Sequence, residues 1–347
     1  MIVTAKFTFY DVTACGYFPH GGEEARFGNL SSMLGQLQRW ATSPQFVLRD
    51  TCTYEAGEGC DTLRTFCFDV AHCRTSGDYL LTTWNEIPST DGKTATVNGG
   101  ARVGSAHVAL TDLPADGIPG YPTYFWFLPP EGLFATVTIN QILNGHPNLG
   151  HYMNGFLRNF SDHACRMVNE EGVIEVCGYH QLPTDPPEKL NPRFQSILRR
   201  NRAEMDFIRS NREDIRKYIR KMKVRPHIAR DTGLLHQLFE HFTGLDQHET
   251  SPEPVKIRYE ITATPSESEL EAIIAEWQAS CGYPTRWDDV GFQFADDDQT
   301  VRWLSYSLAR SDFDIDIPTG GDGVPYQAQA LLDTIQEERD TIRAIVR

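Results

Sequence analysis

Three aspartates near the end of the chain have the residue type and spacing that a metal-dependent nuclease needs. Asp312, Asp314 and Asp316 alternate with apolar residues, so in a β-strand their carboxylates would face one side. Three carboxylates on one face can hold Mg²⁺ for phosphodiester hydrolysis. Such a site also needs an activating Lys or Glu on a neighbouring strand, and the sequence does not locate one. We therefore favour an edge strand with a solvated acidic face and predict no metal site.

A second pattern of chemical interest is the stretch Arg-Asn-Phe-Ser-Asp-His from Arg158 to His163. These six residues alone resemble the Arg-polar-x3-His motif of HEPN-type ribonucleases. The resemblance implies a histidine that acts on the 2′-hydroxyl proton of RNA and an arginine that steadies the phosphate. HEPN domains are all helical, whereas strand-like sequence flanks the motif here. The alternative is an exposed Arg and His on an amphipathic helix without catalytic chemistry, and we favour it.

The distribution of charge is the most informative feature of the chain. Fourteen of the 32 Lys and Arg residues lie between Lys189 and Arg230 with only four acids, which gives this segment about +10 in a protein of net charge −15. An isolated positive segment of this kind is typical of a surface that binds a polyanion, most often nucleic acid. Phosphate binding is mainly Coulombic, so any contact must be confined to this segment.

The basic segment is predicted to form one long helix. Four prolines between 183 and 192 precede it, and residues 193–223 contain no Pro or Gly. Apolar residues recur at spacings of three, four and seven, which predicts a narrow seam packed against another element or a partner helix. The basic residues flank this seam and should point outward. The candidate nucleic-acid-binding residues are Arg199, Arg200, Arg202, Arg209, Arg212, Arg216, Lys217, Arg220, Lys221, Lys223 and Arg225.

Three interpretations of this helix stay open. The favoured one is contact with a DNA backbone, because ten of the fourteen cations are Arg, which can bind phosphate oxygens bidentately. DNA would then be recognised by backbone and shape, with little sequence preference. In the second interpretation the helix mediates dimerisation and pairs with an acidic partner surface. The third is a solvated helix whose charged heads lie in water.

Composition limits the class of protein. With 347 residues, of which 40% are hydrophobic, the chain can bury a sizeable core and is expected to form two domains. No run approaches the roughly 18 apolar residues of a membrane span, and the first residues lack the order of a signal peptide. We therefore expect a cytoplasmic protein with eight reduced cysteines and no cofactor. Motifs for nucleotide hydrolysis, dinucleotide binding, serine hydrolysis or zinc proteolysis are missing, so an enzyme is the less favoured class.

The order of predicted elements indicates an α+β fold. In the first part we expect a strand over 2–10, a helix from about Leu30 to Trp40 capped by Asn29 or Ser31, an aromatic hairpin over 120–128 and 132–137, and helical periodicity over 149–168. In the last part we expect a strand over 255–261, a helix with a Ser266–Glu269 capping box, a hairpin over 291–306, a strand over 312–317 and a final helix from about Pro325. The expected divisions are 1–182 for an N-terminal α+β domain, 183–232 for the basic long-helix segment and 233–347 for a C-terminal α+β domain.

The hairpin and the helix after it resemble a known family. Gly-Tyr-Pro-Thr-Tyr-Phe-Trp-Phe at 120–127, Phe-Ala-Thr-Val at 134–137 and Asn-Gly-Phe-Leu at 154–157 are similar to the corresponding stretch of the RexA family of phage-exclusion proteins of lambdoid prophages. The order of elements is also similar over most of the chain. This resemblance implies a homodimer that binds double-stranded DNA in antiphage defence, without a cofactor and with a membrane-embedded protein partner. The basic segment has no residue-level match to the family, so no binding residue follows from the resemblance.

These observations together predict a DNA-binding protein. We expect it to bind double-stranded DNA without sequence specificity and to act in antiphage defence as a sensor or effector of abortive infection. One alternative is a HEPN-like ribonuclease toxin that uses Arg158 and His163. Another is an interaction subunit of a defence complex, whose basic helix binds an acidic partner.

Overall fold

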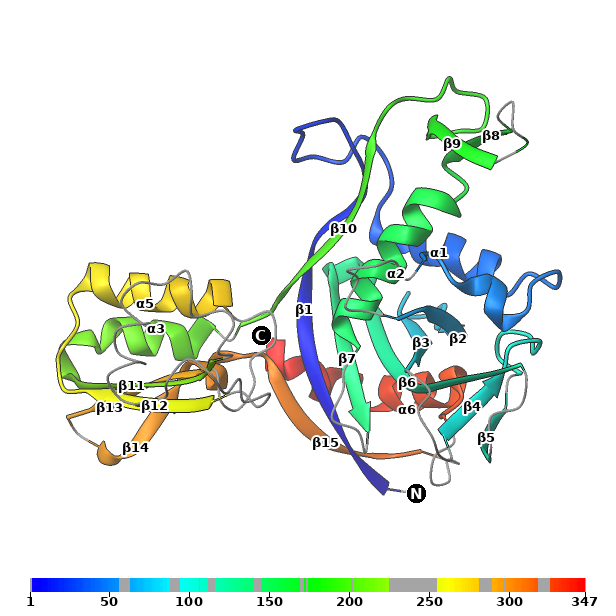
Figure 1. Ribbon diagram of the computed structural model, residues 1–347. Helices are drawn as coiled ribbons and strands as arrows, with labels where there is room; N and C mark the ends of the chain where they lie inside the picture. The colour runs from blue at the N-terminus through cyan, green and yellow to red at the C-terminus, as the bar shows by residue number, and fades with distance from the viewer. Residues whose placement is uncertain are drawn as a thin grey trace, which may run out of the picture. The chain divides into compact units, whose positions relative to one another are not determined.

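The chain divides into two compact units, of which the second is inserted into the first (Figure 1). Unit 1 comprises Met1–Arg199 and Ala309–Arg347, and unit 2 comprises Arg200–Leu308. The computed structural model describes residues 2–55, 63–87, 94–105, 107–111, 116–139, 145–168, 172, 174–200, 202–224, 255–280, 289–295, 297–317 and 325–346. Both units contain helices and antiparallel sheets, so the predicted mixed α+β class is confirmed.

The division differs from the expected boundaries at 182 and 232 because the chain returns to unit 1 after residue 308. Strand β1 (Ile2–Phe18) is long enough to pair with two strands along one edge. Its first half pairs with β15 (Arg310–Asp316) and its second half with β10 (Asn191–Leu198). Strand β7 (Leu133–Ile139) pairs with its other edge. Two strands more than 100 residues apart thus share one partner, which no local pattern indicates.

The sheet of unit 1 is built around the predicted aromatic hairpin, which is confirmed. Strand β6 (Gly117–Leu128) pairs with β7 from Tyr124↔Val137 to Leu128↔Leu133, across the 3₁₀ turn η2 (Pro129–Glu131). The strand order is β10-β1-β7-β6-β3-β2, with β15 on β1 and β4 on β6. The remaining strands of this sheet are β2 (Thr65–His72), β3 (Tyr79–Glu86), β4 (Thr94–Asn98) and β5 (Val108–Thr111).

Both faces of this sheet are buried. Successive strand residues point to opposite sides, so Trp126 and Phe125 of β6 enter different core clusters. Helix α6 (Ala328–Glu337) packs in the Trp126 cluster; α1 (Leu30–Ala41) and α2 (His146–Asn159) pack in the other (Figure 1). Helix α1 begins at its predicted cap, where Asn29 Oδ1 accepts the Ser32 N–H. Helices on both sides thus hold the sheet in a three-layer core.

Shorter elements complete unit 1. The helical pattern predicted over 149–168 ends at Asn159, and the hairpin of β8 (Ala164–Val168) and β9 (Ile174–Tyr179) follows. The C-terminal end contains α7 (Arg339–Arg343) and the 3₁₀ turn η6 (Ala344–Val346); another 3₁₀ turn, η1 (Leu48–Thr51), precedes β2. The aspartate Asp78 is fully buried and lies 2.8 Å from Arg339 Nε, so it ties α7 to the start of β3.

The described residues of unit 2 form a four-stranded antiparallel sheet and two α-helices. Its elements are α3 (Arg202–Ser210), η3 (Arg212–Asp214), β11 (Ile215–Val224), β12 (Val255–Ile261), α5 (Glu267–Ser280), β13 (Asp289–Phe294), β14 (Asp297–Trp303) and η5 (Leu304–Ser307), and its strand order is β12-β11-β13-β14. Strand β12 and the capping box of α5, in which Ser266 and Glu269 exchange hydrogen bonds, match their predictions. Among the described helices of the chain, none is long and apolar enough to cross a membrane.

The single long basic helix is wrong. Residues 193–223 divide among β10, α3 and β11, with η3 as a turn between α3 and β11. Strand β10 is held by eight register pairs with β1, and β11 lies between two partner strands. Helix propensity is a weak preference that such pairing overrides. The apolar spacing of seven from Ile208 to Ile215 crosses the turn and does not mark a continuous seam.

Candidate nucleic-acid interface

The structure distributes the predicted binding residues over both units. Arg199 belongs to unit 1, where its Nη1 lies 2.6 Å from Asp11 Oδ1 and its Nη2 donates to the Val346 carbonyl. Arg200 begins unit 2, with its guanidinium 5.1 Å from the ring centroid of Trp277. Arg225 and the side chains of Arg202 and Lys223 lie outside the described residues. The predicted set is therefore not one continuous helix face.

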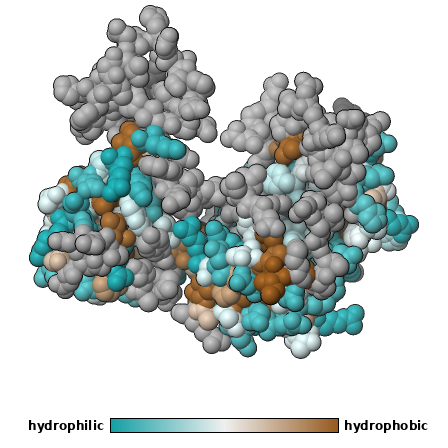
Figure 2. Space-filling model, turned by 90° about the horizontal axis from the view of Figure 1, so that it is seen from below, coloured by the Kyte–Doolittle hydropathy of each residue, from teal (hydrophilic) through white to brown (hydrophobic). Residues whose placement is uncertain are grey.

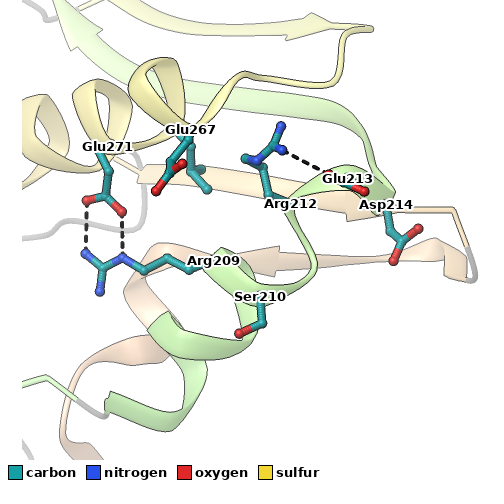
Figure 3. Close-up of a pocket in the computed structure, with 8 residues that line it drawn as sticks. Arg209, Ser210, Arg212, Glu213, Asp214, Glu267 and Glu271 are labelled. Carbon is teal, nitrogen blue, oxygen red and sulfur yellow. Dashed lines mark hydrogen bonds and ion pairs between the residues drawn. The ribbon is translucent and has the colours of Figure 1, made fainter.

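Two of the predicted arginines line a pocket of about 410 Å³ beside α3 and α5 (Figure 3). Arg209 donates from Nε and Nη2 to both carboxylate oxygens of Glu271, at 2.6 and 3.0 Å. This hydrogen bonding holds the pKa of Glu271 below its usual value. Arg212 donates to the Pro265 carbonyl at 2.8 Å and lies 3.2 Å from Glu213. The lining carboxylates are Glu213, Asp214, Glu267 and Glu271, and their excess over two arginines makes the pocket unfavourable for a phosphate.

Two further candidates on β11 also have local roles. Arg216 is exposed and donates to the Glu213 carbonyl at 3.1 Å. Arg220 is only 9% exposed and pairs in register with Tyr259 of β12. Arg220 is buried beside β12, and Arg216 contacts its own turn. Neither residue is therefore suited to the centre of a DNA-binding surface.

The two faces of the unit 2 sheet differ in what they contact. The ring of Phe294 on β13 lies 5.5 Å from that of Phe207 on α3, and the Arg302 guanidinium lies 4.1 Å from the Phe207 centroid. The face that carries Phe294 is therefore turned toward the helices. Residues at the alternate positions of each strand point to the opposite side. On β11 these alternate residues include Lys217, Ile219 and Lys221.

This opposite side gathers cations from two paired strands, and we call it the basic sheet face. Lys221 pairs in register with Arg258, and Ile219 pairs with Glu260. The residues of the face are Lys217 and Lys221 on β11, Lys256, Arg258 and Glu260 on β12, and Trp303 on β14. Figure 2 looks from below the view of Figure 1, and the coloured residues of unit 2, on its left, are mostly hydrophilic with hydrophobic residues between them.

Charges on the basic sheet face are unequal. Glu260 accepts from Lys217 Nζ at 2.9 Å and from Arg258 Nη2 at 2.8 Å, so one carboxylate is shared by two cations. The hydrogen bond from Lys217 and, to a smaller extent, the one from Arg258 lower the pKa of Glu260. Asp289, opposite Lys221, is buried and accepts the backbone N–H groups of Val290 and Ser305. Among the side chains that the structure describes, this face therefore carries four cations and two carboxylates, the exposed Glu260 and the buried Asp289.

An aromatic ring completes the face. Lys221 Nζ lies 3.6 Å from the centroid of the Trp303 ring, a cation–π contact. Trp303 lies flat against β13 because its register partner is Gly291, where an added Cβ would come within 2.8 Å of Cε3 of the indole. The absence of a side chain at Gly291 thus lets the indole pack on the sheet, where the indole contacts Lys221.

The residues that β12 and β14 contribute to this face, Lys256, Arg258, Glu260 and Trp303, were not among the predicted binding residues. Lys256, Arg258 and Glu260 alternate along a predicted strand, so the sequence does place them on one side. The pairing of that strand with β11 spans 30 intervening residues and has no local signal.

The ribonuclease candidates do not form a catalytic pair. Arg158 is exposed near the end of α2 and lines two cavities, whereas His163 lines neither. His163 Nδ1 lies 2.9 Å from the His180 carbonyl, which can only accept, and its Nε2 lies 3.0 Å from the amide nitrogen of Gln36. Both ring nitrogens are thus engaged: Nδ1 carries the proton and Nε2 accepts from the amide. This places His163 in a structural hydrogen-bond chain.

The three aspartates of β15 lie on an edge strand, as the favoured interpretation predicted. Among the described strands β15 pairs only with β1, and Asp312, Asp314 and Asp316 are exposed. Asp314 accepts from Thr4 Oγ1 at 2.7 Å, and Asp312 lies 3.9 Å from Lys6 Nζ. Within the described part of the chain no three His, Cys, Asp or Glu residues are grouped as metal ligands.

Comparisons with known proteins provide no relative for this arrangement. The chain matches no protein-family model, no curated protein and no solved structure. Function is therefore inferred from the side chains and charges of the two units.

Proposed function

We propose that this protein binds double-stranded DNA through the basic sheet face of unit 2, without sequence preference. One observation supports the proposal: on two paired strands, four cations outnumber the two carboxylates described on this face, in a chain of net charge −15. Contacts of Lys and Arg to phosphate oxygens supply most of the sequence-independent affinity for DNA. The overall acidity of the chain then limits the contact to this face.

The pleated sheet spaces these cations for a row of phosphates. Strand residues two apart are separated by about 6.6 Å, and neighbouring strands lie about 4.8 Å apart. Lys221 and Arg258 are directly paired, and Lys217 and Lys256 extend the set along the two strands. Their long side chains can therefore reach several phosphates of one backbone at the same time.

The shared carboxylate supports this use of the face. Lys217 and Arg258 each give one hydrogen bond to Glu260. An ammonium carries three donors and a guanidinium five, so both cations keep donors for phosphate oxygens. Holding the side chains in place before DNA arrives reduces the entropy that binding would otherwise cost.

The RexA-like residues of the aromatic hairpin support a role for this activity in antiphage defence. In this proposal the protein acts in the cytoplasm as a homodimeric sensor or effector of abortive infection, with a membrane-protein partner. A dimer would present two basic sheet faces to one DNA molecule, and linked contacts of this kind raise overall affinity.

The test is the salt dependence of DNA binding. We would measure the affinity of the full chain for a 30-base-pair duplex by fluorescence anisotropy from 50 to 300 mM NaCl. The combined variant Lys217→Gln, Lys221→Gln, Arg258→Gln should reduce the slope of log K against log salt by about 2.7. Affinity should fall at least about tenfold at 100 mM NaCl, since each lost phosphate contact removes a favourable Coulombic term.

A matched control separates this face from general loss of positive charge. The variant Arg209→Gln, Arg212→Gln changes cations that already contact Glu271 and Glu213, and it should leave the slope unchanged. Far-ultraviolet circular dichroism and thermal melting would establish that both variants fold. An unchanged slope in the triple variant would contradict the proposal. Retention of an acidic protein partner after nuclease treatment, with no DNA affinity, would favour the interaction subunit.

A further inference from the structure

A second surface of the molecule, in unit 1, has features of a ligand site that DNA binding does not use. A cavity of about 920 Å³ lies beside the end of α1, the end of α2 and the β8–β9 hairpin. Its volume is in the range of small-molecule sites, about 300–1,000 Å³. Residues from all three of these places line it, so the cavity is formed by tertiary packing.

One wall of this cavity is aromatic. The rings of Trp40 and Phe160 lie 4.9 Å apart between centroids, and Phe46 lies 5.8 Å from Trp40 on the other side. None of these three rings is fully buried, so each contributes surface to the cavity. An aromatic wall of this kind stacks favourably on a planar ligand.

The rim of the same cavity is positively charged. Arg39, Arg158 and Arg166 line it together with a single carboxylate, Asp162, which Arg39 contacts at 2.8 Å. Among the residues that the structure describes, Arg166 donates its Nε–H to the Asn159 carbonyl at 2.9 Å. The Arg158 guanidinium has no hydrogen bond or ion pair with any described residue. Two guanidinium groups therefore keep N–H donors for an anion.

The backbone that carries these groups is held in place. Tyr179 donates from its hydroxyl to the Arg158 carbonyl at 3.3 Å, and Gln36 Oε1 accepts the Asp162 N–H at 2.9 Å. Tyr17 and Ser161 hydroxyls are 2.5 Å apart in the buried layer below. The cavity is thus formed before a ligand enters, which reduces the entropic cost of binding.

We infer that this cavity binds a nucleoside phosphate, with the base against the Trp40 and Phe160 rings and the phosphate on Arg158 and Arg166. The aromatic wall suits the base of such a ligand, and the arginines of the rim suit its phosphate. An apolar ligand would leave the guanidinium groups without partners, and an inorganic anion would leave the aromatic wall uncovered. The Asn159 amide and the Asp162 carboxylate supply the hydrogen-bonding groups that a base edge or ribose requires.

A smaller cavity adjoins the larger one. It has a volume of about 320 Å³ and shares Arg158 and Asn159 with the larger one. His151 and Tyr54 line its other side, with ring centroids 5.7 Å apart. Arg158 lies where the two cavities meet. Because the carboxylate of Glu55 also lines the smaller cavity, a phosphate on Arg158 is expected in the larger one.

The experiment uses the full chain with ATP and AMP as probes. Binding would be measured by isothermal titration calorimetry and by quenching of tryptophan emission. Arg158→Gln should weaken ATP binding about tenfold or more, because it removes charge-assisted hydrogen bonds. Trp40→Phe should retain binding and lose most of the quenching. Arg74→Gln is the matched control: Arg74 is an exposed arginine outside both cavities, and its loss should leave ATP binding unchanged.

Two outcomes would overturn the inference. The first is tripolyphosphate binding as tightly as ATP, because the aromatic wall would then contribute nothing. The second is ATP binding that survives Arg158→Gln but is lost in the Lys217, Lys221, Arg258 triple variant, which would place the nucleotide on the basic sheet face. Arg158→Gln should also keep full DNA affinity, so failure of this inference is distinguishable from failure of the DNA proposal.

Discussion

The sheets of the two units differ in how their faces are covered. In unit 1 both faces are buried under helices, in clusters around Trp126 and Phe125. In unit 2 the described helices α3 and α5 lie on one face, and the other carries cations such as Lys221 and Arg258. A sheet buried on both sides stabilises a fold through apolar burial, whereas a sheet covered on one side can present charged side chains to a ligand.

Among the described residues, the ion pair with the most buried carboxylate lies in unit 1. In unit 1 Arg339 contacts Asp78, which is fully buried and also accepts from Trp126 and Gln336. In unit 2 the pairs on the basic sheet face are partly exposed, as in Lys217 with Glu260. Losing one partner of a buried pair leaves an uncompensated charge, while exposed pairs contribute little. Stability should therefore respond to loss of Asp78, and DNA affinity to loss of cations on the basic sheet face.

The strongest test of this contrast is Asp78→Ala. It leaves Arg339 and the Trp126 N–H without their common acceptor and should cost about 3–5 kcal/mol of unfolding free energy. Urea denaturation would give the loss, and hydrogen exchange should show it in α6 and β3. Asp340→Ala is the control, because this side chain is exposed and contacts Arg343 at the surface. Equal losses in the two variants would contradict a buried network that stabilises unit 1.

The next largest effect should be a pH dependence confined to unit 1. His146 stacks on Tyr10 at 4.2 Å, and burial lowers its pKa from 6.5 to about 4. Between these values the unfolded chain binds more protons than the folded one, so stability falls as pH decreases. The loss between pH 7 and pH 5 should be about 2 kcal/mol. Denaturation of His146→Gln at both pH values should show a smaller difference, and an equal one would exclude His146 as the cause.

A smaller effect is expected on the basic sheet face, at a residue outside the predicted set. Lys256→Gln should lower the salt slope of DNA binding by about 0.9, the value for one phosphate contact. Its stability should stay within about 0.5 kcal/mol of the unchanged protein, as is usual for surface substitutions. A slope equal to that of the unchanged protein would show that Lys256 makes no phosphate contact.

The smallest effect should come from the pocket beside α3 and α5. Arg209→Gln removes the two hydrogen bonds to Glu271, which are exposed, and should cost about 1 kcal/mol or less. DNA affinity and its salt slope should not change. A slope change comparable to that of Lys256→Gln would show that Arg209 binds phosphate in place of Glu271. The two surfaces of unit 2 would then not differ in DNA binding.

Local elements could be predicted from the sequence because their signals are local. The aromatic alternation over 120–137 requires a hairpin, Asn29 can cap only the helix that follows it, and Ser266 and Glu269 form a capping box across one turn. The single helix predicted for the basic segment was wrong because helix propensity does not take account of neighbouring strands. Phe194 pairs with β1 and Ile219 pairs with β12, and this strand pairing outweighs the helix propensity of the segment.

The candidate sites show the same limit. The sequence identifies Lys217 and Lys221 as possible phosphate contacts, but it treats them in the same way as Arg209 and Arg212. Only the fold brings Glu271 to Arg209 and Arg258 to Lys221. The six residues from 158 to 163 contain Arg158 and Phe160 of the unit 1 cavity, whereas Trp40 and Phe46 of its aromatic wall come from another part of the chain.

The sequence by itself determined the mixed α+β class, the local strands and caps, and the concentration of positive charge in one segment. Tertiary structure decided which side chains lie beside each of those charges. Coulombic neutralisation depends on distances between side chains, and strand pairing across 30 or more residues sets those distances without leaving a local pattern. For that reason Arg209 and Arg212 lie among four carboxylates beside α3, whereas Lys217 and Lys221 lie in a group of cations on the basic sheet face.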